Sequence, residues 1–105
     1  MAKRIKWPEY IPMPGRGEFC AGELTDGKRC CLRGWARVAF CGGPNKSLAD
    51  ERALDRFWDR IEVHVRERGK FYEPIAFNDN VRTTDKERAE VWREAAADLG
   101  YEECR

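Results

Sequence analysis

Apolar residues recur at helical spacing in the middle of the chain. The stripe consists of Leu54, Phe57, Trp58, Ile61 and Val65, with polar residues between them. This spacing places the apolar side chains on one face of a helix. Ser47-Leu48-Ala49-Asp50 precedes the stripe and resembles a capping box with Asp in place of the usual Glu, and Gly69 follows it. The pattern predicts an amphipathic helix between these two signals.

Two further segments show the same period. A short helix is predicted from about 31 to 41, because apolar residues recur there at helical spacing and Gly42-Gly43-Pro44 follows. A third helix is predicted after Thr84-Asp85-Lys86-Glu87, which forms a full capping box. Its apolar positions are Val91, Trp92, Ala95, Ala96 and Leu99. Gly100 ends this helix, and we expect Tyr101 to pack back over the final turn.

Two segments have the signature of extended structure. Residues 18–30 alternate between apolar and polar positions around Thr25-Asp26-Gly27-Lys28. Asp-Gly supplies the positive φ angles that a tight turn needs, so we predict a β-hairpin whose return strand leads into the first helix. Residues 71–77 predict a short extended segment that ends in Asn78-Asp79-Asn80.

The first 17 residues are rich in proline and glycine. Each proline removes a backbone donor and pushes the residue before it toward extended geometry. We therefore predict an extended arm over residues 1–17. Its apolar anchors are Trp7, Tyr10, Ile11 and Met13. We favour packing of the arm onto the domain's own core, with packing onto a partner as the alternative.

These segments together predict a fold class. A chain of 105 residues suits one domain, which we place over residues 18–105. The predicted class is α+β: a small single domain with one β-hairpin or short antiparallel sheet packed against three helices. The proline-rich arm precedes it.

Charge changes this picture little. Charged residues make up 37% of the chain, but the net charge is only +1, so we expect a surface of mixed sign without a general attraction to nucleic acid. The first third is mildly basic. Its cations are Lys3, Arg4, Lys6, Arg16, Lys28, Arg29, Arg33 and Arg37. No apolar run approaches the length of a membrane span, and no apolar core of a signal peptide follows the basic start. We therefore expect a cytoplasmic protein with reduced cysteines.

Four cysteines form the sharpest chemical motif: Cys20, Cys30, Cys31 and Cys41. Four thiolates can hold a tetrahedral zinc ion, but no Cys-x-x-Cys pair is present, and adjacent cysteines point in different directions. We interpret them as small core residues and expect no cofactor, with zinc as the alternative. His64 lacks a recognisable nucleophile partner, and Asn78-Asp79 supplies one carboxylate without a second. We therefore do not expect an enzyme, and we interpret Asn78-Asp79 as a structural turn that caps nearby backbone.

Parallel rows of charge lie beside the central apolar stripe. The residues that we select as candidate partner contacts are Arg52, Asp55, Arg56, Asp59 and Arg60, together with Trp7. Rows of opposite sign at this spacing also neutralise each other, and a solvated face is the simpler interpretation.

Two short motifs resemble those of a known family. The sequence reads GELTDGKRCCLRG near the start and IAFNDN much later. In order and spacing these resemble a family of small uncharacterised proteins from bacteriophage and bacterial genomes. Such proteins share an Asp-Gly turn, a Cys-Cys-Leu step into a helix, and a later Asn-Asp pair. Arg33 is an insertion relative to that pattern. The resemblance implies a phage or mobile-element origin and a structural role for the cysteines and the Asn-Asp pair.

Two functions follow from these observations. The first is a phage-encoded module that binds a host protein complex, for example an anti-CRISPR inhibitor of a CRISPR effector or another anti-defence protein. Abundant Trp, Tyr and Arg favour it, because these residues dominate protein interfaces. The alternative is a zinc-stabilised module that binds nucleic acid through the basic first third.

Overall fold

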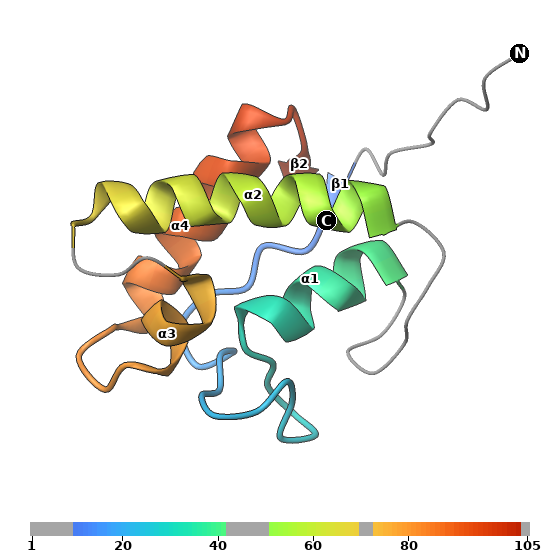
Figure 1. Ribbon diagram of the computed structural model, residues 1–105. Coiled ribbons are helices and arrows are strands. Elements are labelled where there is room, and N and C mark those ends of the chain that lie inside the picture. The colour runs from blue at the N-terminus through green and yellow to red at the C-terminus, as the bar shows by residue number, and fades with distance from the viewer. Residues whose placement is uncertain (1–9, 42–50, 70–72, 104–105) are drawn as a thin grey trace, which may run out of the picture.

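Four helices dominate the computed structural model, which describes residues 10–41, 51–69 and 73–103 (Figure 1). In chain order the elements are β1 (Tyr10–Ile11), α1 (Leu32–Cys41), α2 (Glu51–Glu67), α3 (Pro74–Asp79), α4 (Asp85–Asp98) and β2 (Glu102–Glu103). Within these ranges no helix combines the length and the apolar character that crossing a membrane requires.

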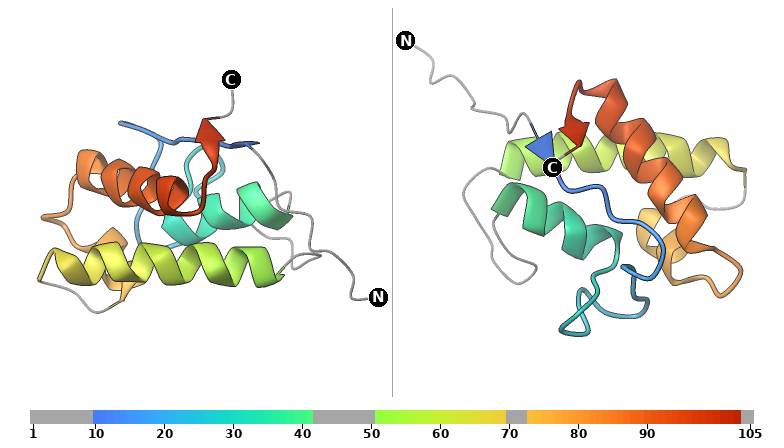
Figure 2. Two further views of the ribbon diagram at one scale, coloured as in Figure 1. Left: turned by 90° about the horizontal axis from the view of Figure 1, so that it is seen from above. Right: turned by 180° about the vertical axis from the view of Figure 1, so that it is seen from behind.

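The long helix α2 organises the core. It packs against α4 along one side and against α1 along another, while α3 contacts both α1 and α2 (Figure 2). The apolar stripe of α2 faces inward: Ala53, Leu54, Phe57, Ile61 and Val65 are all buried. Phe57 meets the ring of Trp92 from α4 edge to face, with 4.7 Å between the ring centroids. The helical stripes read from the sequence are therefore the core of the fold.

The predicted helix boundaries agree with the structure wherever it describes them. Thr84 caps α4 as expected: its hydroxyl accepts from the Glu87 backbone N–H at 3.2 Å, and the Glu87 carboxylate accepts from the Thr84 backbone N–H at 3.1 Å. α1 begins one residue after Cys31. The capping signal predicted for α2 at 47–50 lies outside the described residues. Tyr101 is buried after α4, and its ring lies 5.6 Å from that of Phe40.

The predicted α+β class is wrong. The described residues contain neither a β-hairpin nor an antiparallel sheet. β1 and β2 are two residues long each and pair in parallel, with Tyr10 opposite Glu102 and Ile11 opposite Glu103. The described protein is helical, and this short pairing only joins the first and last of its described segments.

The segment 18–30 fails to form a hairpin because the chain turns too often. Gly17, Gly22 and Gly27 all have positive φ angles, so no stretch is long enough to pair as a strand. The loop instead folds back twice onto Cys30: Phe19 and Thr25 each form an isolated bridge with it. The Asp-Gly turn itself is present.

Asp26 stabilises that turn through its side chain. Its Oδ1 accepts from the backbone N–H groups of Lys28 at 3.0 Å and Arg29 at 2.6 Å. These hydrogen bonds lower the pKa of Asp26 to about 2, and the bond from the Arg29 backbone has the largest effect. An ionised carboxylate bound to backbone therefore holds the turn, together with the backbone hydrogen bond from Asp26 to Arg29 across it.

The extended segment predicted before Asn78 is also wrong, because it forms α3. Glu73, which precedes Pro74, is extended as expected, with φ −125° and ψ 137°. Pro74, however, occupies the start of the helix, where its missing N–H costs nothing. The proline thus begins a helix where a short extended segment was predicted.

Residues 10–17 lie against the helical body. Ile11 is fully buried, and the carbonyl of Pro12 accepts from the indole N–H of Trp92 at 2.7 Å. The backbone N–H of Gly17 donates to Asp85 at the start of α4, at 2.7 Å. The described part of the predicted arm is therefore held by the domain itself, whereas Trp7 lies outside the described residues.

Candidate functional site

Asn78 joins three segments that are distant in the sequence. It lies in the last turn of α3 and is 1% exposed. Its Oδ1 accepts from the backbone N–H of Leu32 at 3.0 Å, and its Nδ2 donates to the carbonyl of Cys20 at 2.9 Å. The amide thus binds backbone groups at the start of α1 and in the loop before it. The Asn-Asp pair was predicted to bind backbone from a turn, whereas Asn78 does so from a helix.

Asp79 extends this junction to the surface. Its Oδ1 accepts from the backbone N–H of Gly22 at 2.9 Å and from Asn78 Nδ2 at 2.9 Å. Its second oxygen, Oδ2, accepts no hydrogen bond from the described residues. The guanidinium of Arg88 donates from Nε to the carbonyl of Asn78 at 3.0 Å and from Nη1 to Asp85 at 2.7 Å. The Asn-Asp pair is therefore fixed by hydrogen bonds on several sides.

Gly34 permits a close approach at the same junction. It lies in the first turn of α1, where the carbonyl of Leu24 passes directly over it. A Cβ atom at this position would lie 2.1 Å from that oxygen and 2.9 Å from the Cβ of Cys30. The same Leu24 carbonyl accepts from the Cys31 backbone N–H at 3.1 Å. Only glycine allows the loop to contact the helix in this way.

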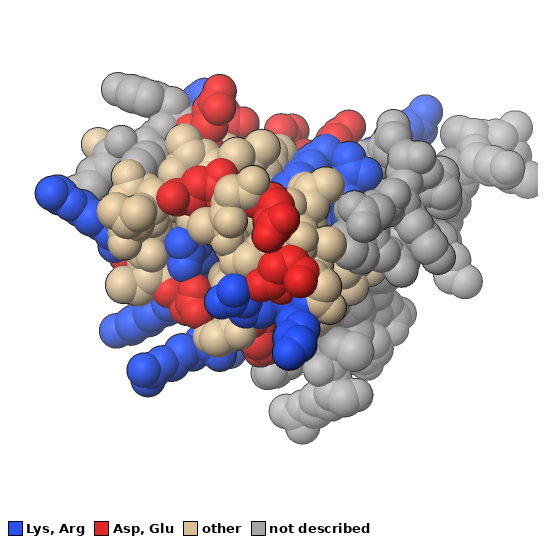
Figure 3. Space-filling model, turned by 90° about the horizontal axis from the view of Figure 1, so that it is seen from below, with Lys and Arg blue, Asp and Glu red and all other residues tan. Residues whose placement is uncertain are grey.

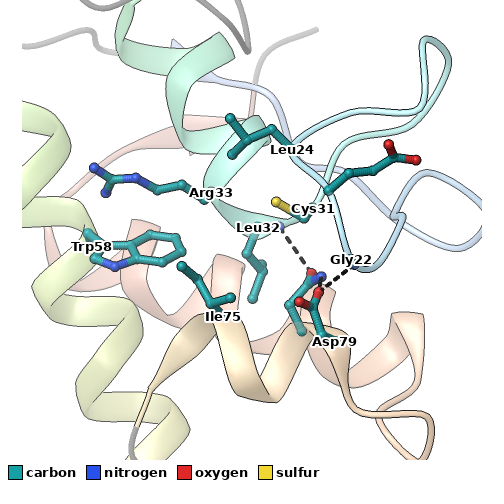
Figure 4. A pocket seen from close by; sticks show the side chains of 10 residues that line it. Gly22, Leu24, Cys31, Leu32, Arg33, Trp58, Ile75 and Asp79 are labelled. Carbon is teal, nitrogen blue, oxygen red and sulfur yellow. Dashed lines mark hydrogen bonds between the residues drawn. The ribbon is translucent and has the colours of Figure 1, made fainter.

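A pocket of about 190 Å³ opens between these segments (Figure 4). Leu24 comes from the loop, Leu32 and Arg33 from the start of α1, Trp58 from α2, and Ile75 from α3. The lining is mainly apolar. Four separate parts of the chain therefore build one surface cavity, and the Asn78 junction holds two of them in place.

The outer wall of the pocket exposes apolar groups to water. Ile75 is 53% exposed and lies beside Trp58 on this wall. Trp58 is partly buried against the core, and the guanidinium of Arg33 lies 5.0 Å from the centroid of its ring. This cation–π contact holds Arg33 at the end of the pocket that lies opposite Asp79 (Figure 4).

The described cysteines are buried thiols, of which Cys31 lines the pocket. Cys20, Cys30 and Cys31 are all free and buried, whereas the side chain of Cys41 lies outside the described part of the chain. Burial raises the pKa of both Cys20 and Cys31, which disfavours the thiolate that zinc binds. Among the described residues, no group of three or more His, Cys, Asp or Glu side chains is placed to hold a metal ion. The zinc alternative stays a prediction.

The predicted contact surface on α2 is only partly available. Arg52, Asp55, Arg56 and Asp59 are exposed, but Arg60 is bound to α4 through two hydrogen bonds to Asp98, at 2.8 and 3.0 Å. Acidic and basic residues are also intermingled on the face shown in Figure 3. These charges form no field of one sign, so the surface lacks a marked electrostatic signature.

His64 lies between α2 and α4 rather than beside a nucleophile. Its Nε2 is 2.6 Å from Asp98 Oδ2, and its Nδ1 is 3.0 Å from Glu94 Oε2. Arg68 approaches Glu94 and Glu90 of α4, at 3.3 Å from each. The histidine is therefore part of a polar seam that joins the two longest helices.

This seam predicts an acid-sensitive contribution to stability. Hydrogen bonds from His64 and then Arg60 lower the pKa of Asp98 below its ordinary value of about 4. A carboxyl group whose pKa is lowered by folding stabilises the fold at any pH above its unfolded-state pKa. This stabilisation is lost as the pH falls through its folded-state pKa. We expect Asp98→Asn to lower the free energy of unfolding by about 1 kcal/mol or less at neutral pH, because the pair is partly exposed.

Urea unfolding at neutral pH and again below pH ~4 checks this prediction. The difference between wild type and Asp98→Asn should shrink on acidification. Asp55→Asn removes an equivalent charge from the exposed face of α2 and should show no such change. A difference that stays constant across the pH range would contradict the assignment.

Comparison with known proteins identifies the family to which this fold belongs. A model for a family of unknown function, DUF6197, matches residues 14–98. The chain belongs to this family. The match spans the loop and all four helices, and hence every segment that lines the pocket. The match agrees with the predicted resemblance to an uncharacterised family, but it does not test the short motifs on which that resemblance was based. No curated protein and no solved structure matches the chain.

The pocket of this DUF6197 domain was not predicted from the sequence. The apolar pattern placed Trp58 in the stripe of α2 and Ile75 in a short extended segment. One signal was present: Trp58 follows Phe57 directly, and two adjacent residues on a helix point in directions about 100° apart. Only one of them can lie at the centre of the stripe, so the other had to lie at its edge.

Proposed function

We propose that this protein is a protein-binding module whose pocket receives an apolar side chain of a partner protein. The partner that we expect is a host protein complex in the bacterial cytoplasm. The observation that carries the proposal is the partly exposed apolar wall formed by Trp58 and Ile75 at the mouth of the cavity. Exposed apolar surface at a concave, preformed site is typical of binding surfaces.

The size of the pocket supports a protein rather than a small molecule as the ligand. Sites for drug-sized ligands enclose about 300–1,000 Å³. The pocket here measures about 190 Å³, which suits one side chain. Tryptophan and arginine are also among the residues that are enriched at the energetic centres of protein interfaces. Trp58 and Arg33 supply this pair at one end of the pocket.

The more specific hypotheses from the sequence stay predictions. These are a phage or mobile-element origin and inhibition of a CRISPR effector or another defence complex. The zinc-stabilised nucleic-acid module also stays a prediction, and no feature of the described fold favours it over the protein-binding module.

Substitution of Ile75 tests the proposed function. We expect Ile75→Asp to weaken partner binding by about tenfold or more, because a carboxylate in the apolar wall disfavours burial of the partner's side chain. The fold should persist, since the residue is half exposed and lies in the first turn of α3, where an acidic residue is tolerated. Pull-down from a bacterial host lysate, quantified by mass spectrometry, measures the loss.

Val81→Asp is the matched control. Val81 is 98% exposed and does not line the pocket, so the same change of charge and polarity occurs elsewhere on the surface. The proposal requires a captured protein that Val81→Asp retains and Ile75→Asp loses. Equal capture by both variants would refute a role for the pocket, as would capture of background proteins only.

A further inference from the structure

The two ends of the pocket carry opposite charge. Figure 4 shows Asp79 at one end and Arg33, lying over Trp58, at the other. The apolar side chains of Leu32 and Ile75 lie between them. Any segment that crosses this pocket therefore meets a carboxylate, an apolar surface and a guanidinium in a fixed order.

The carboxylate end has one unused acceptor. Asp79 places both of its hydrogen bonds from the described residues on Oδ1, where Gly22 and Asn78 donate. Oδ2 accepts none, and the residue is exposed. Glu23 also lines the pocket next to Gly22 and adds a second negative charge on this side. No cation among the described residues forms an ion pair with Asp79 or Glu23.

We propose that the pocket selects a protein segment in which an aliphatic side chain stands next to a lysine or arginine. The aliphatic group packs against the apolar wall formed by Trp58 and Ile75, and the neighbouring cation pairs with Oδ2 of Asp79. This inference rests on the proposed function and names the chemistry of the partner segment at the same site.

The charge at each end fixes the direction of the segment. A basic side chain toward Arg33 would bring two cations together, whereas the same side chain toward Asp79 forms an ion pair. Electrostatic complementarity of this kind contributes more to specificity than to affinity. An exposed ion pair contributes at most about 1 kcal/mol, so we expect the basic neighbour to strengthen binding by up to about fivefold.

Selection from a displayed library of short random peptides tests the inference. The bait is the purified full chain. We expect the enriched peptides to share an aliphatic residue with Lys or Arg beside it. A fluorescein-labelled consensus peptide is then compared with two versions, one with the basic residue changed to Gln and one with the aliphatic residue changed to Gly. Fluorescence anisotropy gives the dissociation constant of each.

Asp79→Asn separates the charge from the geometry. The amide keeps an oxygen that accepts from Gly22, but it removes the negative charge. In this variant the Lys-to-Gln change in the peptide should no longer weaken binding, while in the wild type it weakens binding up to about fivefold. Glu62→Gln, which removes a carboxylate of α2 outside the pocket, should behave as wild type. The peptide comparison on wild-type protein stands by itself if Asp79→Asn unfolds.

The outcomes distinguish the two proposals. Enrichment of aliphatic residues without a basic neighbour overturns the inference and leaves the proposed function intact. A Lys-to-Gln change that does not weaken binding to the wild type does the same. If Ile75→Asp weakens the binding of none of the enriched peptides, or if no peptide is enriched, both the proposed function and the inference are overturned. Loss of binding on the Lys-to-Gln change in the wild type, but not in Asp79→Asn, supports the inference.

Discussion

Gly34→Ala is expected to lower the free energy of unfolding by about 2 kcal/mol or more. On helix propensity alone the sign is opposite, because alanine in a helix interior is about 1 kcal/mol more favourable than glycine. Here the added methyl group would lie 2.1 Å from the carbonyl oxygen of Leu24. Backbone cannot move aside as a flexible side chain does, so the loop must separate from α1. That separation breaks the hydrogen bond from Cys31 to Leu24.

Urea unfolding followed by tryptophan fluorescence measures this effect. Gly15→Ala is the control, because its Cβ would have no neighbour closer than the Glu18 carboxylate at 3.9 Å and its φ angle is negative. We expect that variant to unfold within about 0.5 kcal/mol of wild type. A Gly34→Ala variant as stable as wild type would show that the loop does not lie against the helix as described.

Asn78→Ala should have an effect of similar size for a different reason. The substitution leaves the Leu32 N–H and the Cys20 carbonyl buried without their partner. Each unsatisfied buried polar group costs about 1–3 kcal/mol, so we expect a loss of about 3 kcal/mol. The space left by the amide adds to this loss, since Asn78 is among the largest fully buried side chains.

Asn80→Ala provides the comparison for Asn78. Asn80 lies two residues later, and its Oδ1 accepts from the exposed Arg82 N–H at 2.9 Å. Water replaces that partner when the side chain is removed, so the expected loss is about 1 kcal/mol or less. Denaturant midpoints for both variants check the difference. Equal losses would mean that the buried bonds of Asn78 contribute no more than a surface turn does.

Both predictions concern a junction that the sequence revealed only in part. The helices α1, α2 and α4 were predictable, because stripes such as Leu54 to Val65 and the capping box at Thr84 report local structure directly. α3 was not, because a six-residue helix holds too few turns to show a period. The loop 18–30 was misread because alternation and an Asp-Gly turn also occur where a chain folds back on itself twice.

The pocket lay beyond the sequence for a related reason. Its walls come from four segments, and no local pattern indicates that Leu24, Trp58 and Ile75 meet. The Asn-Asp pair was recognised as a structural feature, but its partners Leu32 and Gly22 are 46 and 57 residues away from Asn78 and Asp79, respectively. Spacing along the chain predicts neighbours within an element, and tertiary partners of this kind follow only from the fold.

The parallel pairing of β1 with β2 has a consequence for biosynthesis. Ile11 reaches its place beside Glu103 only when nearly all of the described chain is available, and Trp92 meets Pro12 across a separation of 80 residues. A nascent polypeptide held in the ribosomal exit tunnel cannot make these contacts, although α1 and α2 can already associate. Closing so long a loop costs chain entropy before any stabilising contact has formed. β1 and β2 can therefore pair only after translation has passed α4.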